Sequence, residues 1–217
     1  MEICKEKQTE IDEIYRKSKK EIDAAIKGYA DTMNFEEKDY FAEIAFCILT
    51  PQSKARNAWS AITKLKENGL LYTGNSEEIV EYLNVVRFKN NKSRYLVELR
   101  NLMTRNGKLD SKNILKEIGD VYEKRNWILK NVKGMGLKEA AHVLRNLGYG
   151  RYLAILDRHV LKNLKELGVI DEIPKSLTKN KYFEIEKLMI AYSEKVNIPM
   201  DALDLVFWSQ QAGEVFK

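Results

Sequence analysis

The chain has 217 residues and a small excess of positive charge, with 37 lysines and arginines against 32 aspartates and glutamates and a formal net charge of +5. Apolar residues make up 44% of the sequence, which excludes an intrinsically disordered chain and is enough for a substantial core. The charge permits binding to nucleic acid but does not require it. No apolar run approaches the roughly 20 residues that cross a bilayer, so we expect no membrane association.

The two cysteines do not indicate a disulfide or a metal centre. Cys4 lies in a polar segment and Cys47 in an apolar one, and no cysteine cluster has metal-ligand spacing. This argues against a zinc site or an iron–sulfur cluster. The N-terminal segment is rich in Glu and Lys and lacks the apolar centre of a signal peptide. We therefore expect an intracellular protein in a reducing compartment.

Helical periodicity dominates the sequence, and no strand pattern of useful length is present. We expect Ser53 to cap the third helix, Ser76 to open a short one, Asp157 to cap another and Pro199 to lie in the first turn of the last. The expected helices cover residues 5–30, 36–50, 53–67, a short segment from 76, 90–104, 111–131 with a break near 119–120, 137–147, a segment from 157 that ends at 168, 179–194 and 200–212. The predicted fold is all-α, with about ten short helices and no internal repeat.

A glycine turn joins two of these helices in the segment Val132-Lys133-Gly134-Met135-Gly136. Two glycines one residue apart allow a tight reversal of the chain. They also expose backbone N–H groups at the start of the following helix, where the helix dipole favours an anion such as a DNA phosphate. A plain turn without a ligand has the same residues, so both interpretations stay open on this segment alone.

Two ionisable residues near the turn suggest chemistry. Lys138 lies in the first turn of the next helix, where the dipole favours the neutral, nucleophilic amine. A solubilising surface lysine is the alternative. Asp157 follows the apolar connector Ala154-Ile155-Leu156 and either only caps its helix or also brings a carboxylate back toward the amine. His159 is an ordinary histidine or a phosphate contact.

Together these motifs resemble the helix-hairpin-helix DNA glycosylase superfamily, with its Gly-x-Gly hairpin, catalytic lysine and distal aspartate. Within it, the chain is most similar to the archaeal-type 8-oxoguanine DNA glycosylase/AP lyase, which some bacteria also carry. The likeness is carried by Phe46-Cys47-Ile48-Leu49-Thr50, VKGMGLKEAAHVLRN (132–146), ILDRH (155–159), DEIPK (171–175) and the extreme C-terminus.

The resemblance implies one helix-hairpin-helix glycosylase unit over residues 1–217, built from two helical subdomains with the active site in the cleft between them. Residues 36–149, with the hairpin at 131–138, would form one subdomain, and residues 1–35 with 150–217 the other. The absence of a cysteine-ligated cluster and of a large N-terminal domain favours the compact branch of the superfamily.

The resemblance also implies a bifunctional DNA repair enzyme. Lys138 would attack C1′ of the extruded nucleoside and form a Schiff base, and Asp157 would stabilise positive charge on the sugar. The base would leave, and β-elimination would then cut the strand. The implied partner is double-stranded DNA with a damaged base. We expect no cofactor, a monomer, and action at the nucleoid in a prokaryotic cytoplasm.

Further residues acquire expected roles from the resemblance. Gln52 would fill the gap left by the extruded base, and Phe88 would act as a wedge on the opposite strand or, equally, belong to the core. Asp204, Trp208 and Lys217 would recognise the base, although a tryptophan at this place is also typical of a core. The expected DNA contacts at the hairpin and beyond it are Val132, Gly134, Met135, Gly136 and His159. Whether a monovalent cation binds the backbone of Val132 and Gly134 is left open.

Two alternatives remain. A monofunctional glycosylase for another damaged base would keep the aspartate without the lysine, so Lys138 weighs against it. A non-catalytic helix-hairpin-helix protein would use the hairpin for phosphates alone, and it would show salt-sensitive DNA binding with no need for Asp157.

Overall fold

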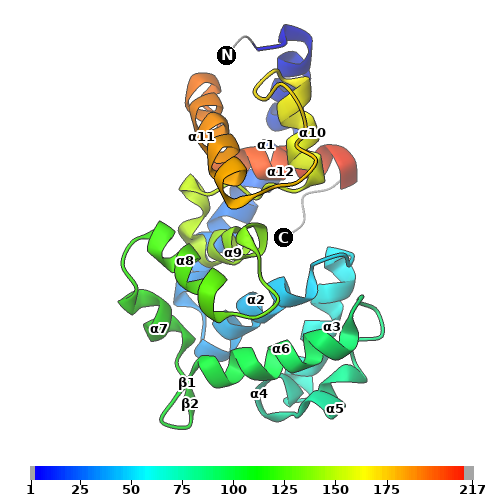
Figure 1. The fold of residues 1–217 in the computed structure, drawn as a ribbon, viewed down its shortest axis with the longest axis vertical. Helices are drawn as coiled ribbons and strands as arrows, with labels where there is room; N and C mark the ends of the chain where they lie inside the picture. The colour runs from blue at the N-terminus through cyan, green and yellow to red at the C-terminus, as the bar shows by residue number, and fades with distance from the viewer. Residues whose placement is uncertain (1–2, 213–217) are drawn as a thin grey trace. The chain divides into compact units, whose positions relative to one another are not determined.

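The computed structural model of the protein describes residues 3–212, and the side chains of residues 3–210. The chain is all-α, as predicted, with twelve α-helices in the described part rather than about ten (Figure 1). It divides into two compact units, Thr32–Leu147 and the combination of Met1–Asp31 with Gly148–Lys217. No helix among residues 3–212 is both long and apolar enough to cross a membrane.

The unit Thr32–Leu147 is organised around one buried helix, α2. Every residue of α2 from Tyr40 to Leu49 is buried, because helices α3, α6, α7 and α9 pack around it. The helices of this unit are α2 (Glu37–Leu49), α3 (Ala55–Glu67), α4 (Leu70–Thr73), α5 (Ser76–Val80), α6 (Lys89–Leu102), α7 (Ser111–Glu117), α8 (Val121–Asn131) and α9 (Leu137–Leu144).

A short hairpin of two-residue strands lies in this unit and is compatible with the predicted all-α fold, which expected no strand of useful length. Strands β1 (Thr104–Arg105) and β2 (Lys108–Leu109) pair antiparallel after α6. Between them, Asn106 and Gly107 have φ values of 50° and 74°. Two consecutive left-handed residues of the Asn-Gly type form the tight turn that matches the twist of paired strands. The helix expected over 90–104 therefore ends at Leu102, two residues early.

Helix capping agrees with the sequence at two places and differs at a third. The predicted break near 119–120 is confirmed, since Asp120 caps α8 by accepting from the N–H groups of Tyr122 and Glu123. Ser76 opens α5 as expected, behind the capping residue Asn75. Ser53 does not cap α3, because Lys54 holds that position without a side-chain cap. The serine hydroxyl instead has partners from distant segments, described below.

The second unit is organised around the C-terminal helix α12. Helices α1, α10 and α11 and the short 3₁₀ turn at 150–152 all pack against α12, whose residues 202–207 are buried. Asp157 caps α10 and Pro199 directly precedes α12, so the expected starts of both helices are correct within one residue. The helices of this unit are α1 (Lys5–Asp31), α10 (Arg158–Glu166), α11 (Lys179–Val196) and α12 (Met200–Ala212).

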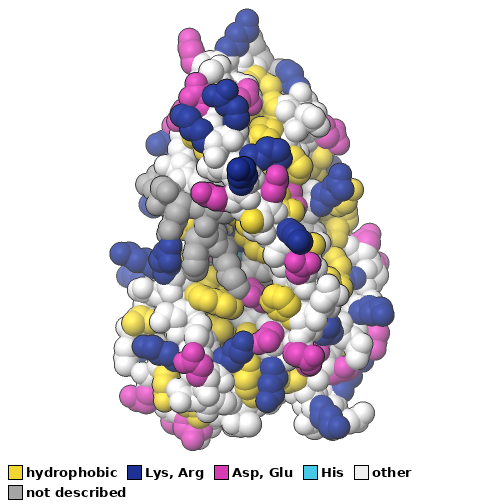
Figure 2. Space-filling model, turned by 180° about the vertical axis from the view of Figure 1, so that it is seen from behind, with side chains coloured by type: hydrophobic (Ala, Val, Ile, Leu, Met, Phe, Trp, Pro, Cys, Tyr) yellow, Lys and Arg dark blue, Asp and Glu magenta, His cyan; other side chains and the backbone are white. Residues whose placement is uncertain are grey.

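The surface charge is mixed. On the face shown in Figure 2, lysine and arginine side chains are interspersed with acidic ones and do not gather into a single continuous patch. This fits the small net charge of +5.

Candidate active site

The turn between α8 and α9 requires glycine at only one of its two glycine positions. Gly134 has a φ of 80°, and a Cβ added there would lie 2.5 Å from the ring of Tyr95. Gly136 has extended backbone, with a φ of −94°, which any residue adopts. The side chains of Val132 and Met135 are buried and anchor the turn in the core. Their side chains are therefore not available for the DNA contact that the sequence predicts at these two residues.

We expect Gly134→Ala to weaken the hairpin. A left-handed alanine costs about 1–2 kcal/mol, and the added methyl also forces the Tyr95 ring to move. The free energy of unfolding, measured with urea, should fall by at least this amount, and DNA affinity should fall with it. Gly136→Ala adds the same methyl group 3.1 Å from a flexible Glu139 oxygen and should have a smaller effect. Equal losses in the two variants would contradict this account of the turn.

Glu139 occupies the start of α9 and had no role in the sequence-based prediction. Its carboxylate accepts a hydrogen bond from the Gly136 N–H at 3.1 Å, and its other oxygen lies 3.0 Å from the Lys138 Nζ. The N–H of Gly136, which we expected to be open for a phosphate, thus already has an acidic partner from the chain. The signal for Glu139 was present in the Gly136-x-x-Glu139 spacing, which is that of a capping box.

Lys138 lies at the edge of a buried region in which charged and neutral side chains are mixed. Its side chain is 30% exposed, and the buried His142 lies one turn further along α9. Burial, together with the positive charges of Arg145 and Lys138, lowers the pKa of His142 well below 6.5, so the imidazole is neutral at pH 7. Burial likewise raises the pKa of the Cys47 thiol. The His142 Nε2 is buried and has no hydrogen-bond partner within residues 3–212.

Asp157 is held by its own helix and by the connector before it. Its Oδ1 accepts hydrogen bonds from the N–H groups of His159 and Val160, both at 2.8 Å. The connector is fixed at Ala154, whose N–H donates to Glu186 at 2.9 Å and whose carbonyl accepts from the Tyr182 hydroxyl. The expected capping role of Asp157 is confirmed. Lys138 belongs to the unit Thr32–Leu147 and Asp157 to the other unit.

Gln52 and Phe88 share three properties. Both are exposed, both have left-handed backbone, with φ values of 55° and 59°, and both line one hollow of about 210 Å³. Gly134 of the hairpin and Tyr95 of α6 line the same hollow. Phe88 is 56% exposed, which overturns the alternative that it belongs to the core.

A buried lysine, which the sequence analysis did not identify, lies beside this hollow. Lys92 is only 4% exposed, and its Nζ donates to the carbonyls of Leu49 and Pro51 at 2.8 Å each and to the Ser53 hydroxyl at 3.1 Å. The available signal was its register, because Lys92 falls on the face of α6 that Leu96 and Leu99 bury.

The burial of Lys92 predicts a pH dependence of stability. Desolvation lowers the pKa of this amine to about 8, against an opposing effect of the Glu139 carboxylate. Between pH 8 and about 10.5 the unfolded chain holds a proton that the folded chain has lost, so Lys92 makes the free energy of unfolding rise with pH by up to about 1.4 kcal/mol per unit. Urea titrations from pH 7 to 10 should show this rise relative to Lys92→Met. Parallel pH profiles for the two proteins would contradict it.

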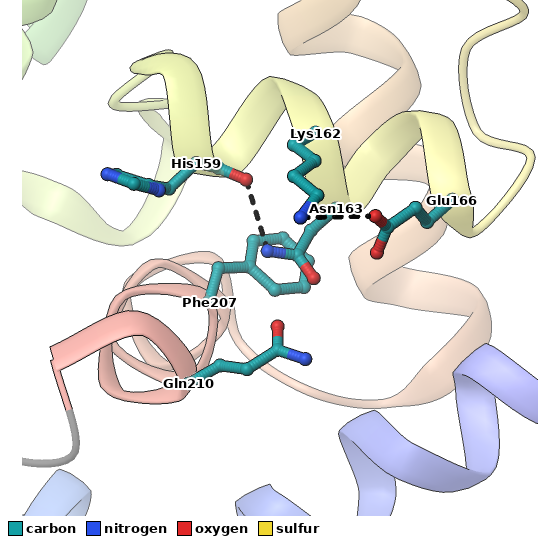
Figure 3. A pocket seen from close by; sticks show the side chains of 6 residues that line it. All are labelled: His159, Lys162, Asn163, Glu166, Phe207 and Gln210. Carbon is teal, nitrogen blue, oxygen red and sulfur yellow. Dashed lines mark hydrogen bonds and ion pairs between the residues drawn. The ribbon is translucent and has the colours of Figure 1, made fainter.

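His159 lies at a second hollow, of about 220 Å³, between α10 and α12. The hollow is lined by His159, Lys162, Asn163, Glu166, Phe207 and Gln210 (Figure 3). The His159 carbonyl accepts a hydrogen bond from the Asn163 side chain at 3.1 Å, while the imidazole ring points away from Asn163 and Gln210. The ring is partly exposed, so it can contact a group outside the hollow.

The residues expected to recognise the base lie mostly on α12. Asp204 is buried and Trp208 is partly exposed, and four-residue spacing places them on one face of the helix. Lys217 lies outside the described residues. Among residues 3–212, no group of three or more His, Cys, Asp or Glu side chains could hold a metal ion.

Comparisons with known proteins add a consistent result. The sequence model of the family described as 8-oxoguanine DNA glycosylase matches residues 6–198. A protein of Fusobacterium nucleatum named 8-oxoguanine DNA glycosylase/AP lyase is 53% identical over 209 residues, or 96% of each chain. A protein of the same name from Methanocaldococcus jannaschii is 36% identical over 198 residues, covering 90% of this chain and 91% of that protein.

A solved structure supports the same relationship. The Methanocaldococcus jannaschii 8-oxoguanine glycosylase/lyase in complex with a 15-mer DNA containing 8-oxoguanine superimposes with a TM-score of 0.87. The two sequences are 33% identical in this alignment, which covers 96% of this chain and 98% of the other.

Proposed function

The chain belongs to the 8-oxoguanine DNA glycosylase family, and on that premise we propose that it excises 8-oxoguanine from double-stranded DNA and then cleaves the strand at the abasic site. The observation that carries the proposal is the match over 96% of the chain to a relative with both activities in its name. Lys138, at the start of α9 behind the glycine hairpin, supplies the amine that distinguishes this chemistry from simple hydrolysis.

Lys138 acts as the nucleophile. Its neutral amine attacks C1′ of the extruded nucleoside while the bond from C1′ to the base breaks, and the base leaves with a proton. Opening of the sugar gives a Schiff base between Nζ and C1′. Removal of a C2′ proton then breaks the bond from C3′ to its phosphate oxygen, which cuts the strand. The imine makes this elimination possible because it accepts the electron pair.

Asp157 acts on the charge that develops in the sugar. Departure of the base builds positive charge at C1′, and a carboxylate nearby lowers the energy of that transition state. Its Oδ1 is fixed by two backbone N–H groups, so the carboxylate has a set orientation before DNA arrives. This preorganisation supports a catalytic role in addition to capping.

The DNA is held and distorted by residues that the structure leaves exposed. The hairpin backbone near Gly134, with His159, binds phosphates on the strand that carries the lesion, whereas the Gly136 N–H is already paired with Glu139. Gln52 fills the space of the extruded base, and Phe88 wedges against the opposite strand. Extrusion is necessary because the reacting C1′ bond is inaccessible within the stacked duplex.

Recognition of the base involves Asp204, Trp208 and Lys217. Oxidation converts N7 of guanine from an acceptor into an N–H donor, which a carboxylate or carbonyl at the chain terminus can accept. We expect deletion of Lys217 to reduce the preference for 8-oxoguanine over guanine, measured as the ratio of single-turnover excision rates. Unchanged selectivity would place recognition elsewhere in the protein.

The proposed function is tested by borohydride trapping on DNA duplexes that carry different damaged bases. The expected result is a covalent protein–DNA adduct and strand cleavage with 8-oxoguanine, and little of either with undamaged guanine. Excision without an adduct would indicate a monofunctional glycosylase, and salt-sensitive binding without excision would indicate a non-catalytic DNA-binding protein. Because one chain supplies both Lys138 and Asp157, we propose a monomer, acting in a prokaryotic cytoplasm.

A further inference from the structure

We propose that Lys92 and Ser53 form a clamp that positions Gln52 and Phe88 for extrusion of a paired base. The inference rests on the proposed function, since it assigns these two residues to filling and wedging the DNA. It adds two positioning residues that do not themselves touch the sugar or the base.

The first part of the clamp is the buried ammonium at the end of α2. The last carbonyls of a helix lack intrahelical partners, and here Lys92 donates to the carbonyl of Leu49 and, two residues further on, to that of Pro51. A positive charge at a helix C-terminus is also favoured by the helix dipole. With its third bond to Ser53, one amine fixes both sides of Gln52.

The second part of the clamp joins the loop to the segment before α6. The Ser53 hydroxyl accepts a hydrogen bond from the Arg87 N–H at 3.0 Å, across 34 positions of sequence. Arg87 immediately precedes Phe88. A parallel link joins the Asn57 side chain to the Val85 carbonyl at 3.2 Å. Ser53 is therefore the point at which the Gln52 loop and the Phe88 segment are tied together.

The clamp accounts for the strained backbone of the two residues it joins. Gln52 and Phe88 are non-glycine residues in the left-handed region, a strained conformation that persists only when the surroundings impose it. Both line the hollow that also includes Gly134 of the phosphate-binding hairpin. Fixing the loop therefore fixes both side chains relative to the DNA backbone contact.

A buried ammonium contributes little net free energy of folding, so stability alone does not explain why this loop is held by one. Removing a charge from water costs free energy that its hydrogen bonds only partly return, and a well-packed apolar side chain is often at least as stabilising. The desolvation is visible in the lowered pKa of Lys92. Retaining the charge is understandable if the loop must keep one geometry while it displaces a stacked base.

The test compares Lys92→Met and Ser53→Ala with a matched control. Lys124 is also a buried lysine of the same unit, and it donates to the carbonyls of Ile118 and Gly119 at the end of α7, away from the hollow. Lys124→Met therefore removes a comparable ammonium from a helix end without touching the clamp. Thermal melting of all three variants establishes that each is folded.

Excision should be measured in single turnover on two substrates, 8-oxoguanine paired with cytosine and 8-oxoguanine opposite an abasic analogue. We expect Lys92→Met to slow excision of the paired lesion by about 10- to 100-fold, because a displaced positioning group has effects of this size. Ser53→Ala, which removes hydrogen bonds alone, should slow it about fivefold. With the unpaired lesion, whose extrusion is easier, both losses should shrink to about twofold or less.

A second readout follows extrusion without requiring excision. Fluorescence of 2-aminopurine placed next to the lesion should rise on binding of the wild-type protein and of Lys124→Met, and rise less with Lys92→Met and Ser53→Ala. Equal losses on paired and unpaired lesions, unchanged rates, or the same loss in Lys124→Met would overturn the clamp. If Lys92→Met fails to fold, the excision rates and the fluorescence of Ser53→Ala test the clamp on their own. If the wild-type protein excises neither lesion, the proposed function is wrong. The fluorescence of the wild type and the three variants on DNA still tests whether the clamp supports extrusion of the base.

Discussion

Replacement of Lys138 by Gln is expected to abolish the covalent adduct with 8-oxoguanine DNA. The amide cannot form a Schiff base, so both borohydride trapping and β-elimination should fall to below about one part in 10³ of the wild-type level. Binding to the same DNA should change little, because the hairpin backbone and its buried anchors are untouched. The measurement is single-turnover trapping with saturating protein, together with fluorescence anisotropy for affinity.

The matched control is Lys133→Gln on the same hairpin. The Lys133 side chain is 66% exposed and forms an ion pair with Glu98 at 2.9 Å, so it carries the same charge without facing the start of α9. We expect it to retain trapping and to lose at most a modest part of its DNA affinity, with a shallower salt dependence. An undiminished adduct in Lys138→Gln would show that another amine is the nucleophile.

Asp157→Asn should slow excision of 8-oxoguanine by about 10²- to 10³-fold, since it removes one preorganised charge from the transition state. Asparagine is as good a helix cap as aspartate, so the hydrogen bonds to the N–H groups of His159 and Val160 can persist. The free energy of unfolding should therefore stay close to that of the wild type. This separates the charge from the cap in a single variant.

Two further variants serve as controls for Asp157→Asn. Asp120→Asn makes the same change at the cap of α8, where the carboxylate accepts from two backbone N–H groups in the same way, and we expect it to keep full activity. Asp157→Ala loses both charge and cap and should lose about 1 kcal/mol of stability as well. Near-normal excision by Asp157→Asn would leave this residue with a structural role alone.

The sequence was most informative where structure depends on neighbours in the chain. The Asp157 cap, the break before Asp120 and the glycine turn follow from spacings of two to four residues. The interpretation that both glycines are needed for the turn was wrong for Gly136, because only Gly134 of the pair has left-handed backbone. Glu139 was readable from its capping-box spacing, but its second contact, with Lys138, depends on the actual side-chain directions.

The sequence was least informative where a side chain finds its partner far along the chain. Ser53 is a residue type that commonly caps helices, but its hydroxyl instead bonds Arg87 and Lys92, 34 and 39 positions away. The exposure of Phe88 is likewise set by a left-handed backbone that no periodic pattern encodes. Such residues are recognisable only once the long-range contacts are known.

The connector that ends at Asp157 is bound on both sides of the Ala154 peptide unit, by Glu186 at its N–H and by Tyr182 at its carbonyl. The orientation of the Asp157 carboxylate therefore depends on α11, a helix to which the proposed chemistry assigns no role. Random mutagenesis scored for loss of repair should recover substitutions at these two α11 positions among the inactive clones. Judged by burial alone, the same positions would be classed as ordinary interior residues.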